Sequence, residues 1–329
     1  MALLFMDGFD AGDLALKWNS STGNTTSNTT TRFNAGRSAF FGGGSNYIIK
    51  YLPASSEIYV GFAAMLATIN TVTIMNVYTD SGVSAQLNIT IAAGYALSVR
   101  RGTTVLFTTP MATINAGWNY IELRAKIDSA AGAAELIVNG MSVGSFTGNT
   151  KNTGTSTNID GIQFTNGASI NWYIDDVYVC DATGPAPYNT FLGEVRMHTL
   201  TPNAAGSSTQ FTPSAGANYA TVDELPYSAT DYVTSSTTGH RDTYSVSDLP
   251  TSPGTILAVQ NNIIAKRTDA TPVDLKPTIV SAGTPYYGAN VSLTASDITY
   301  RDLLVSDPAT GVSWTASGVN AAESGFEIV

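Results

Sequence analysis

The chain has 329 residues and a formal net charge of −10, and only 12% of its residues are charged. This length allows two domains with separate cores, although an average globular protein has about twice that fraction of charged residues. The net negative charge argues against general binding to nucleic acid or to anionic membranes. The single cysteine, Cys180, excludes an intrachain disulfide and a cysteine-based zinc site, and we expect it to be a buried thiol.

The N-terminal stretch, MALLFMDGFD, has no basic residue before its apolar part, so it does not resemble a signal peptide. The most apolar later stretch, Ile58–Ile69, has about half of the roughly 20 residues that a membrane helix needs. We therefore expect a chain made without an export signal and without membrane insertion.

Residues 1–180 contain short segments of strand-like character, separated by Gly, Asn, Ser and Thr. The alternation of apolar and polar residues, without any long amphipathic helix, predicts an antiparallel sandwich or barrel. The loop Asn19–Thr31, which is rich in Ser, Thr and Asn, is expected to be exposed. The predicted strands are Ile58–Leu66, Val72–Tyr78, Ala85–Ile91, Ala96–Arg100, Val105–Thr108, Trp118–Ile127, Ala134–Val138 and Asn171–Val179.

The segment Trp118–Ser145 gives the strongest local signal. Between Trp118 and Asp128, apolar residues alternate with Glu122, Arg124 and Lys126, which is typical of a strand with one buried and one wet face. Asn139-Gly140 lies between two apolar runs and tolerates the positive φ angles of a type I′ turn. The sequence therefore predicts a long strand followed by a tight hairpin.

The segment Asp181–Thr190, DATGPAPYNT, interrupts this pattern with two prolines and a glycine. We predict domains at 1–182 and 191–329 with a linker at 183–190. The second domain is expected to be β-rich, with one short helix at Trp314–Ser324 that has Gly325 as its glycine C-cap. Its predicted strands are Thr243–Val246, Thr255–Ala265, Thr278–Val280 and Val291–Thr294.

Several segments of residues 1–180 resemble the laminin-G and concanavalin-like jelly rolls. The similar segments, in order, are DGFD (Asp7–Asp10) with Trp18, GRSAFFGGG (Gly36–Gly44), the strand that begins at Trp118, the hairpin around Asn139-Gly140 and WYIDDVYV (Trp172–Val179). The resemblance implies an antiparallel jelly-roll sandwich, so we expect a mainly β protein. Members of this family often bind carbohydrate, and some relatives hydrolyse it.

The second half resembles the C-terminal part of structural proteins of tailed bacteriophages. The similar segments are Leu192–Ser214, Asn218–Pro226, Gly239–Pro250 and Asp307–Ile328. This resemblance implies a virion component assembled in the host cytoplasm, with other virion proteins and sister subunits as partners, for which we expect a homo-oligomer such as a trimer. The first hypothesis is a tail or baseplate appendage that contacts host-surface glycan, and the alternative is a capsid decoration protein or head fibre.

A glycan-degrading enzyme is a third hypothesis, from another functional class. Glycoside hydrolysis needs two carboxyl groups about 5–9.5 Å apart across the sugar bond. The jelly-roll relatives that hydrolyse glycans place alternating acids along one strand, and this sequence has no such run. The adjacent acids Asp175-Asp176 and Asp223-Glu224 would point to opposite faces of a strand, so we predict no catalytic residues.

Asp175 and Asp176 lie in an otherwise apolar strand, where an unpaired carboxylate would be costly. Strict alternation would place Asp176 with Trp172, Ile174 and Tyr178, and Asp175 with Tyr173, Val177 and Val179. One interpretation is that one acid accepts backbone hydrogen bonds and the other lies at an edge. The alternative is a structural Ca²⁺ site formed by Asp175, Asp176, Asp7 and Asp10, because the jelly-roll resemblance implies that the first and last strands meet.

Aromatic side chains are the expected ligand contacts, because sugar rings present flat C–H faces that stack on them. Most of these side chains are expected to belong to the core. Tyr120 is the predicted exposed contact, because it alternates in phase with Glu122, Arg124 and Lys126. The aromatic candidates are Tyr47, Tyr51, Tyr78, Tyr95, Trp118, Tyr120, Trp172 and Tyr173.

Overall fold

The computed structural model describes residues 3–23, 25–33, 36–66, 71–167, 170–251 and 253–329. The chain divides into two compact units, Met1–Met197 and His198–Val329. The predicted linker at 183–190 and the residues after it, up to Met197, therefore belong to the first unit. No helix in the described ranges is long and apolar enough to cross a membrane.

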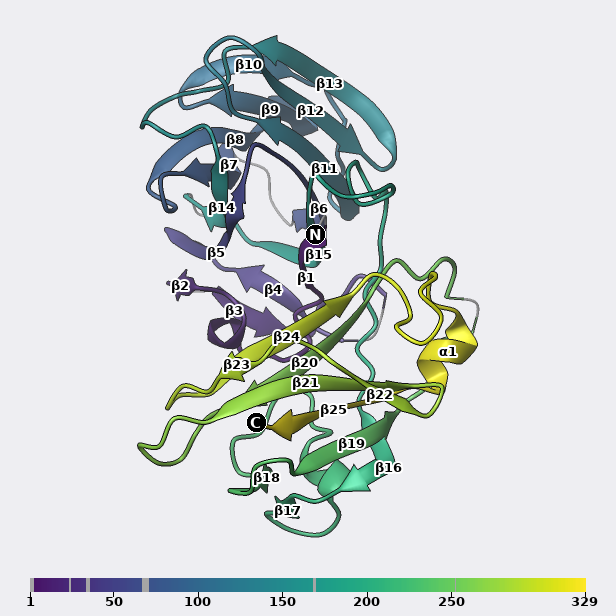
Figure 1. Cartoon of the computed structure of the whole chain (residues 1–329). Helices are drawn as coiled ribbons and strands as arrows, with labels where there is room; N and C mark the ends of the chain where they lie inside the picture. The colour runs from purple at the N-terminus through teal and green to yellow at the C-terminus, as the bar shows by residue number, and fades with distance from the viewer. Residues whose placement is uncertain (1–2, 24, 34–35, 67–70, 168–169, 252) are drawn as a thin grey trace. The chain divides into compact units, whose positions relative to one another are not determined.

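The first unit is a sandwich of two antiparallel sheets, whose strands run alongside each other in Figure 1. In spatial order the first sheet consists of β13 (Met141–Gly148), β12 (Gly132–Val138), β11 (Trp118–Lys126), β6 (Glu57–Leu66), β15 (Trp172–Asp181), β4 (Ser38–Phe41) and β3 (Thr25–Asn28), and β1 (Leu3–Asp7) also pairs with β15. The second sheet consists of β10 (Thr104–Thr108), β9 (Ala96–Arg101), β8 (Ser84–Ala92), β7 (Val72–Thr79), β14 (Ile159–Asn166), β5 (Asn46–Ser55) and β2 (Ser20–Thr22).

The core of the first unit lies between these two sheets. Alternate residues of facing strands, such as Leu123 of β11 and Ile89 of β8, are fully buried there. Phe41 and Trp172 stack with a centroid distance of 4.5 Å. Burial of each such large side chain contributes about 1.5–3 kcal/mol, so this layer of side chains holds the two sheets together. The predicted fold class, a mainly β protein with a jelly-roll sandwich, is confirmed.

The predicted hairpin is confirmed at Asn139-Gly140. Val138 pairs with Met141, and the two turn residues have φ angles of 49° and 77°. These positive values are those of a type I′ turn. The predicted loop Asn19–Thr31 is partly wrong, because Ser20–Thr22 and Thr25–Asn28 form edge strands.

Strict alternation fails in β15 because of a β-bulge. Asp175 pairs with Ala63 and Tyr178 with Gly61, so three steps along β15 match two along β6. Asp176 takes a φ of 50°, which an aspartate tolerates better than most residues. After the bulge, Val177 and Val179 face the core and Tyr178 faces away, so the predicted division of faces is wrong beyond Asp175.

The second unit is β-rich with one short helix. Its largest sheet consists of β16 (Pro202–Thr209), β19 (Arg241–Val246), β25 (Glu323–Ile328), β21 (Asp274–Ser281) and β22 (Thr284–Tyr287), with β23 (Val291–Ser292) on β21. Two smaller sheets pair β17 (Thr212–Pro213) with β18 (Val233–Thr234) and β20 (Val259–Ala265) with β24 (Ile298–Leu304).

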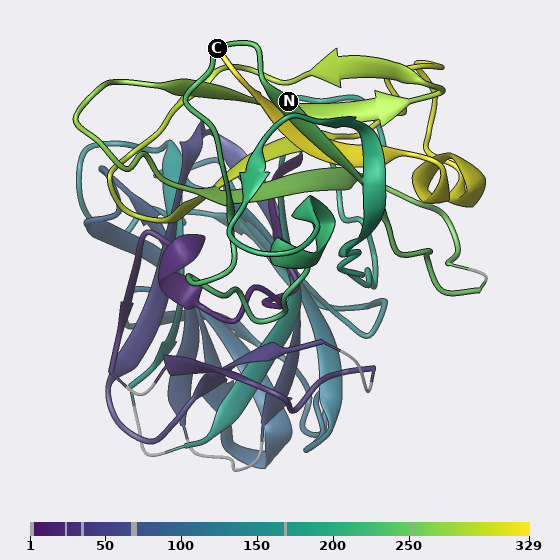
Figure 2. The same cartoon turned by 90° about the horizontal axis from the view of Figure 1, so that it is seen from below.

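The helix α1 (Ala316–Asn320) is the yellow coil at one end of the strands of this unit in Figure 1 and Figure 2. It is shorter than predicted and begins after Thr315, whose hydroxyl oxygen accepts a hydrogen bond from the Gly318 amide. Its C-cap is Ala321, and Gly325 lies inside β25, so the predicted glycine cap is wrong.

Candidate functional site

Asp7 alternates in phase with the core residue Phe5 of β1, and Asp10 lies after that strand. The other predicted site residues, Tyr120, Asp175 and Asp176, lie on the outer face of the first sheet. This face is covered at β11 and β15 by residues 191–197 of the same unit. Glu122 Oε1 accepts hydrogen bonds from the Gly193 amide at 2.9 Å and from the Tyr178 hydroxyl. The Tyr178 hydroxyl in turn accepts one from the Leu192 amide at 3.0 Å. The buried acid therefore holds the covering segment in place.

Tyr120 is buried, with 2% of its surface exposed, so its predicted exposure is wrong. Its hydroxyl donates to the backbone carbonyl of Asp176 at 3.1 Å, and the Arg32 guanidinium lies 4.9 Å from its ring centroid. The alternation of β11 is as predicted. Its outer face is not exposed to solvent at Tyr120, because residues 191–197 cover it. A single strand pattern cannot show which later segment covers it.

The four aspartates of the predicted calcium site have separate partners. Asp7 accepts from the Trp18 indole at 2.8 Å and from the Lys17 ammonium at 3.1 Å. Asp10 accepts from the Arg37 amide at 2.7 Å. Asp176 pairs with the Arg32 guanidinium at 2.9 Å, while its own amide donates to Asp175 at 2.8 Å.

This arrangement differs from the converging oxygens that Ca²⁺ requires. Among the residues that the structure describes, no group of three or more His, Cys, Asp or Glu side chains could hold a metal ion. The geometry therefore gives no support to the predicted site at Asp7, Asp10, Asp175 and Asp176. Burial, and then the charge of Asp176, raises the pKa of Asp175 to about 8.

The outer face of the second sheet carries a row of polar side chains. Cross-strand register aligns Gln163 of β14 with Asn76 of β7, Asn76 with Asn88 of β8, and Asn88 with Arg100 of β9. Their sequence neighbours, such as Phe164 and Val77, face the core, so these four side chains point away from it. We call Gln163, Asn76, Asn88 and Arg100 the polar row.

The polar row crosses four adjacent strands. With a strand spacing of about 4.8 Å, it extends about 14 Å, which suits an oligosaccharide. The Asn76 amide donates to Gln163 Oε1 at 2.8 Å, and the Asn88 amide donates to the Gly102 carbonyl at 2.9 Å. These bonds fix the side-chain orientations, so the row presents fixed donors and acceptors.

Three tyrosines flank one end of this row, and we call Tyr47, Tyr51 and Tyr78 the tyrosine group. The Tyr78 hydroxyl donates to Gln163 Oε1 at 3.1 Å. Burial, and then the nearby Tyr47, raises the pKa of Tyr78. Tyr51 is 47% exposed, and a Cβ added at Gly82 would lie 2.3 Å from its ring, so the ring rests on that glycine. Sequence analysis included all three as aromatic candidates but could not separate them from core tyrosines.

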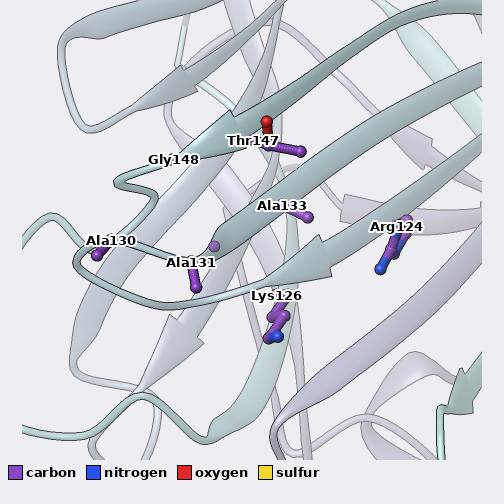
Figure 3. A pocket seen from close by; sticks show the side chains of 8 residues that line it. Arg124, Lys126, Ala130, Ala131, Ala133, Thr147 and Gly148 are labelled. Atoms are coloured by element: carbon purple, nitrogen blue, oxygen red, sulfur yellow. The ribbon is translucent and has the colours of Figure 1, made fainter.

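A shallow pocket of about 410 Å³ lies on the outer face of β11, β12 and β13 (Figure 3). Its lining residues are Arg124, Lys126, Ala130, Ala131, Gly132, Ala133, Thr147 and Gly148. None of these eight has an aromatic ring, and Arg124 forms an ion pair of 2.6 Å with Glu57. The pocket therefore lacks the stacking surface that the second sheet provides.

Comparison with protein-family models gave no match for this sequence, and comparison with curated proteins gave none. Several solved structures are similar in fold to about half of the chain. The cellulose-induced protein Cip1 has a TM-score of 0.43 and 17% identity, covering 58% of this chain and all of its own. An endo-β-1,4-glucuronan lyase from the fungus Trichoderma reesei has a TM-score of 0.37 and 13% identity, covering 54% of this chain and 94% of its own.

Domain 4 of an extracellular arabinanase from Geobacillus stearothermophilus, in complex with arabinotriose, has a TM-score of 0.37 and 15% identity, covering 55% of this chain and 92% of its own. A sialidase has a TM-score of 0.35 and 11% identity over 45% of this chain, but the matched part is only 15% of the sialidase. By their names, the lyase, the arabinanase and the sialidase act on glycans. At these scores the likenesses do not assign an activity to this chain.

Proposed function

We propose that the first unit binds an oligosaccharide on the outer face of the second sheet. The observation that carries this proposal is the polar row beside the tyrosine group on one sheet face. Amide side chains pair with sugar hydroxyls, which both donate and accept hydrogen bonds. Phenol rings stack on the C–H faces of sugars. Preformed hydrogen bonds within the row reduce the entropy lost when a ligand binds.

The unit binds the glycan without hydrolysing it. Neither the polar row nor the tyrosine group contains a carboxyl group, whereas glycoside hydrolysis needs two of them. The buried acids in the strands of the first sheet all accept hydrogen bonds from protein groups; they are Asp7, Glu122, Asp175, Asp176 and Asp181. Incubation of the full chain with a neutral glycan that it binds should therefore release no new reducing ends.

The second part of the proposal is that the chain is a virion component of a tailed phage, in which the second unit joins the particle or sister subunits. Support for it comes from the resemblance of residues 192–328 to phage structural proteins. Immunogold labelling of purified virions tests this part. Label at the tail tip supports a host-binding appendage, label on capsomers supports decoration of the head, and absence of the chain from virions would contradict it.

An oligosaccharide array probed with the full chain tests the binding proposal. We expect retention of a limited set of glycans by the wild-type chain and loss of that retention in Gln163→Ala. Failure to retain any glycan, or equal retention by both chains, would overturn the proposal.

A further inference from the structure

Arg100 is the one charged member of the polar row, and its side chain has no partner among the residues that the structure describes. Within the described part of the chain, no hydrogen bond or ion pair is found for its guanidinium, and its Nε is buried without an acceptor. By contrast, Arg32, Arg124 and Arg241 each form ion pairs with carboxylates. Arg37, Arg101 and Arg267, which have no ion pair in the described structure, each donate to a hydroxyl or a backbone carbonyl.

The surroundings of Arg100 are neutral. Its cross-strand neighbours are Asn88 of β8 and Val105 of β10, and the side chains next along the outer face are Ser98 and Thr90. A buried donor without an acceptor costs about 1–3 kcal/mol, and more when the donor group is charged. Because no carboxylate of the described chain offsets this cost, Arg100 is poised for an anion that the protein itself does not supply.

We propose that Arg100 binds the carboxylate of an acidic sugar, so that the ligand of this face is an oligosaccharide containing uronic-acid units. The inference depends on the proposed glycan-binding function and names the substrate class. A guanidinium matches a carboxylate with two parallel N–H···O bonds, which a neutral sugar cannot supply. Asn88, one strand away, and then Asn76 would contact hydroxyls of neighbouring sugar units along the row.

Calorimetric titration of the full chain tests this inference. The probes are oligomers of glucuronic, galacturonic and mannuronic acid, each compared with its carboxyl-reduced form, together with a sulfated galactose oligomer. Reduction removes the charge and keeps the ring stereochemistry. We expect at least one acidic oligomer to bind tenfold or more tightly than its reduced form, with affinity falling as salt is raised.

Variants of two neighbouring arginines complete the test. Arg100→Gln should abolish the preference for the acidic oligomer, and Arg100→Lys should keep part of it. Arg101→Gln is the matched control, because it makes the same charge change on the same strand and Arg101 instead donates to the Asn149 carbonyl. Circular dichroism of each variant confirms the fold.

Equal binding of acidic and reduced oligomers, or an unchanged preference in Arg100→Gln, would overturn the inference. Binding of the sulfated oligomer alone would also overturn it. Binding of neutral glycans that depends on Gln163 but not on Arg100 would overturn the inference and leave the proposed function intact. If none of these probes binds and the full chain retains no glycan on the oligosaccharide array, both the inference and the proposed glycan-binding function are overturned.

Discussion

Asn76 and Gln163 lie opposite each other across β7 and β14, and the Asn76 amide donates to Gln163 Oε1 at 2.8 Å. The Tyr78 hydroxyl donates to the same oxygen, so its two lone pairs are both used. In the described structure, Gln163 Nε2 and Asn76 Oδ1 have no protein partner. A free donor and a free acceptor therefore lie side by side, which is the pattern that two adjacent sugar hydroxyls complement.

Gln163→Glu is expected to abolish glycan binding while the protein stays folded. A carboxylate still accepts the bonds from Asn76 and Tyr78, so the free energy of unfolding should remain close to that of the wild type. The free donor is lost, and we expect the affinity for the glycan to fall tenfold or more. Binding titrations and urea denaturation measure the two quantities, and an unchanged affinity would contradict the role of Gln163.

Tyr51→Ala is expected to weaken binding without loss of stability. The ring is 47% exposed, and stacking on a sugar is worth about 1 kcal/mol, which corresponds to about fivefold in affinity. Tyr232→Ala in the second unit is the matched control, because Tyr232 is similarly exposed at 52%. Titrations with the glycan identified on the array compare the two variants. Equal effects of the two substitutions would show that Tyr51 is not a ligand contact.

Asp175→Asn is expected to stabilise the first unit at neutral and alkaline pH. Burial, and then the charge of Asp176, raises the pKa of Asp175 to about 8, whereas its value in an unfolded chain is near 3.8. The folded state therefore holds the proton more tightly, and the wild type loses stability as the pH rises from about 4 to about 8. Asparagine carries no charge and keeps an acceptor for the Asp176 amide.

Urea denaturation at pH 5, 6.5 and 8, followed by tryptophan fluorescence, measures this effect. The fluorescence of Trp18, Trp118 and Trp172 reports on the first unit. Asp128→Asn is a control of opposite sign, because hydrogen bonds from the Ala131 and Ala130 amides lower the pKa of Asp128. The prediction would be contradicted if the free energy of unfolding had the same pH dependence in the wild type and in Asp175→Asn.

Gly61→Ala is expected to destabilise the first sheet by about 2 kcal/mol, as overpacking of a tight interior does. A Cβ at this position would lie 2.0 Å from Cε1 of Tyr178, whose ring occupies the space above Gly61. Thermal unfolding measures the loss. The clash is absent in the double variant Gly61→Ala with Tyr178→Ala. Its loss of stability should therefore be much smaller than the sum of the losses in the two single variants. Additive losses would show that the clash is relieved in another way.

Much of the first unit was predictable from its sequence. The strand at Ile121–Lys126 and the turn at Asn139-Gly140 could be predicted because residues close in sequence determine both. The bulge at Asp176 was not predictable, because a positive φ at one aspartate is imposed by the pairing of β15 with β6 and leaves no mark in the pattern. The burial of Tyr120 depends on residues 191–197, which are distant in sequence.

In the candidate site, too, the residue types could be predicted from the sequence, whereas their arrangement could not. Tyr47, Tyr51 and Tyr78 were among the aromatic candidates, because their chemistry is visible in any sequence. Their grouping with the polar row required the register of β5, β14 and β7, since a shift of one residue would turn each side chain to the other face. Arg100 gave no signal in the sequence, because only the structure shows that an arginine lacks an acid partner.

Hydrogen-exchange mass spectrometry of the full chain, with and without a saturating glycan, tests the central claim most directly. The account predicts slower exchange in peptides from β5, β7, β8 and β14, which carry the tyrosine group and most of the polar row. Exchange in peptides from β11, β12 and β13 should be unchanged. Protection confined to β11–β13 or to the second unit would contradict the claim that this sheet face binds the ligand.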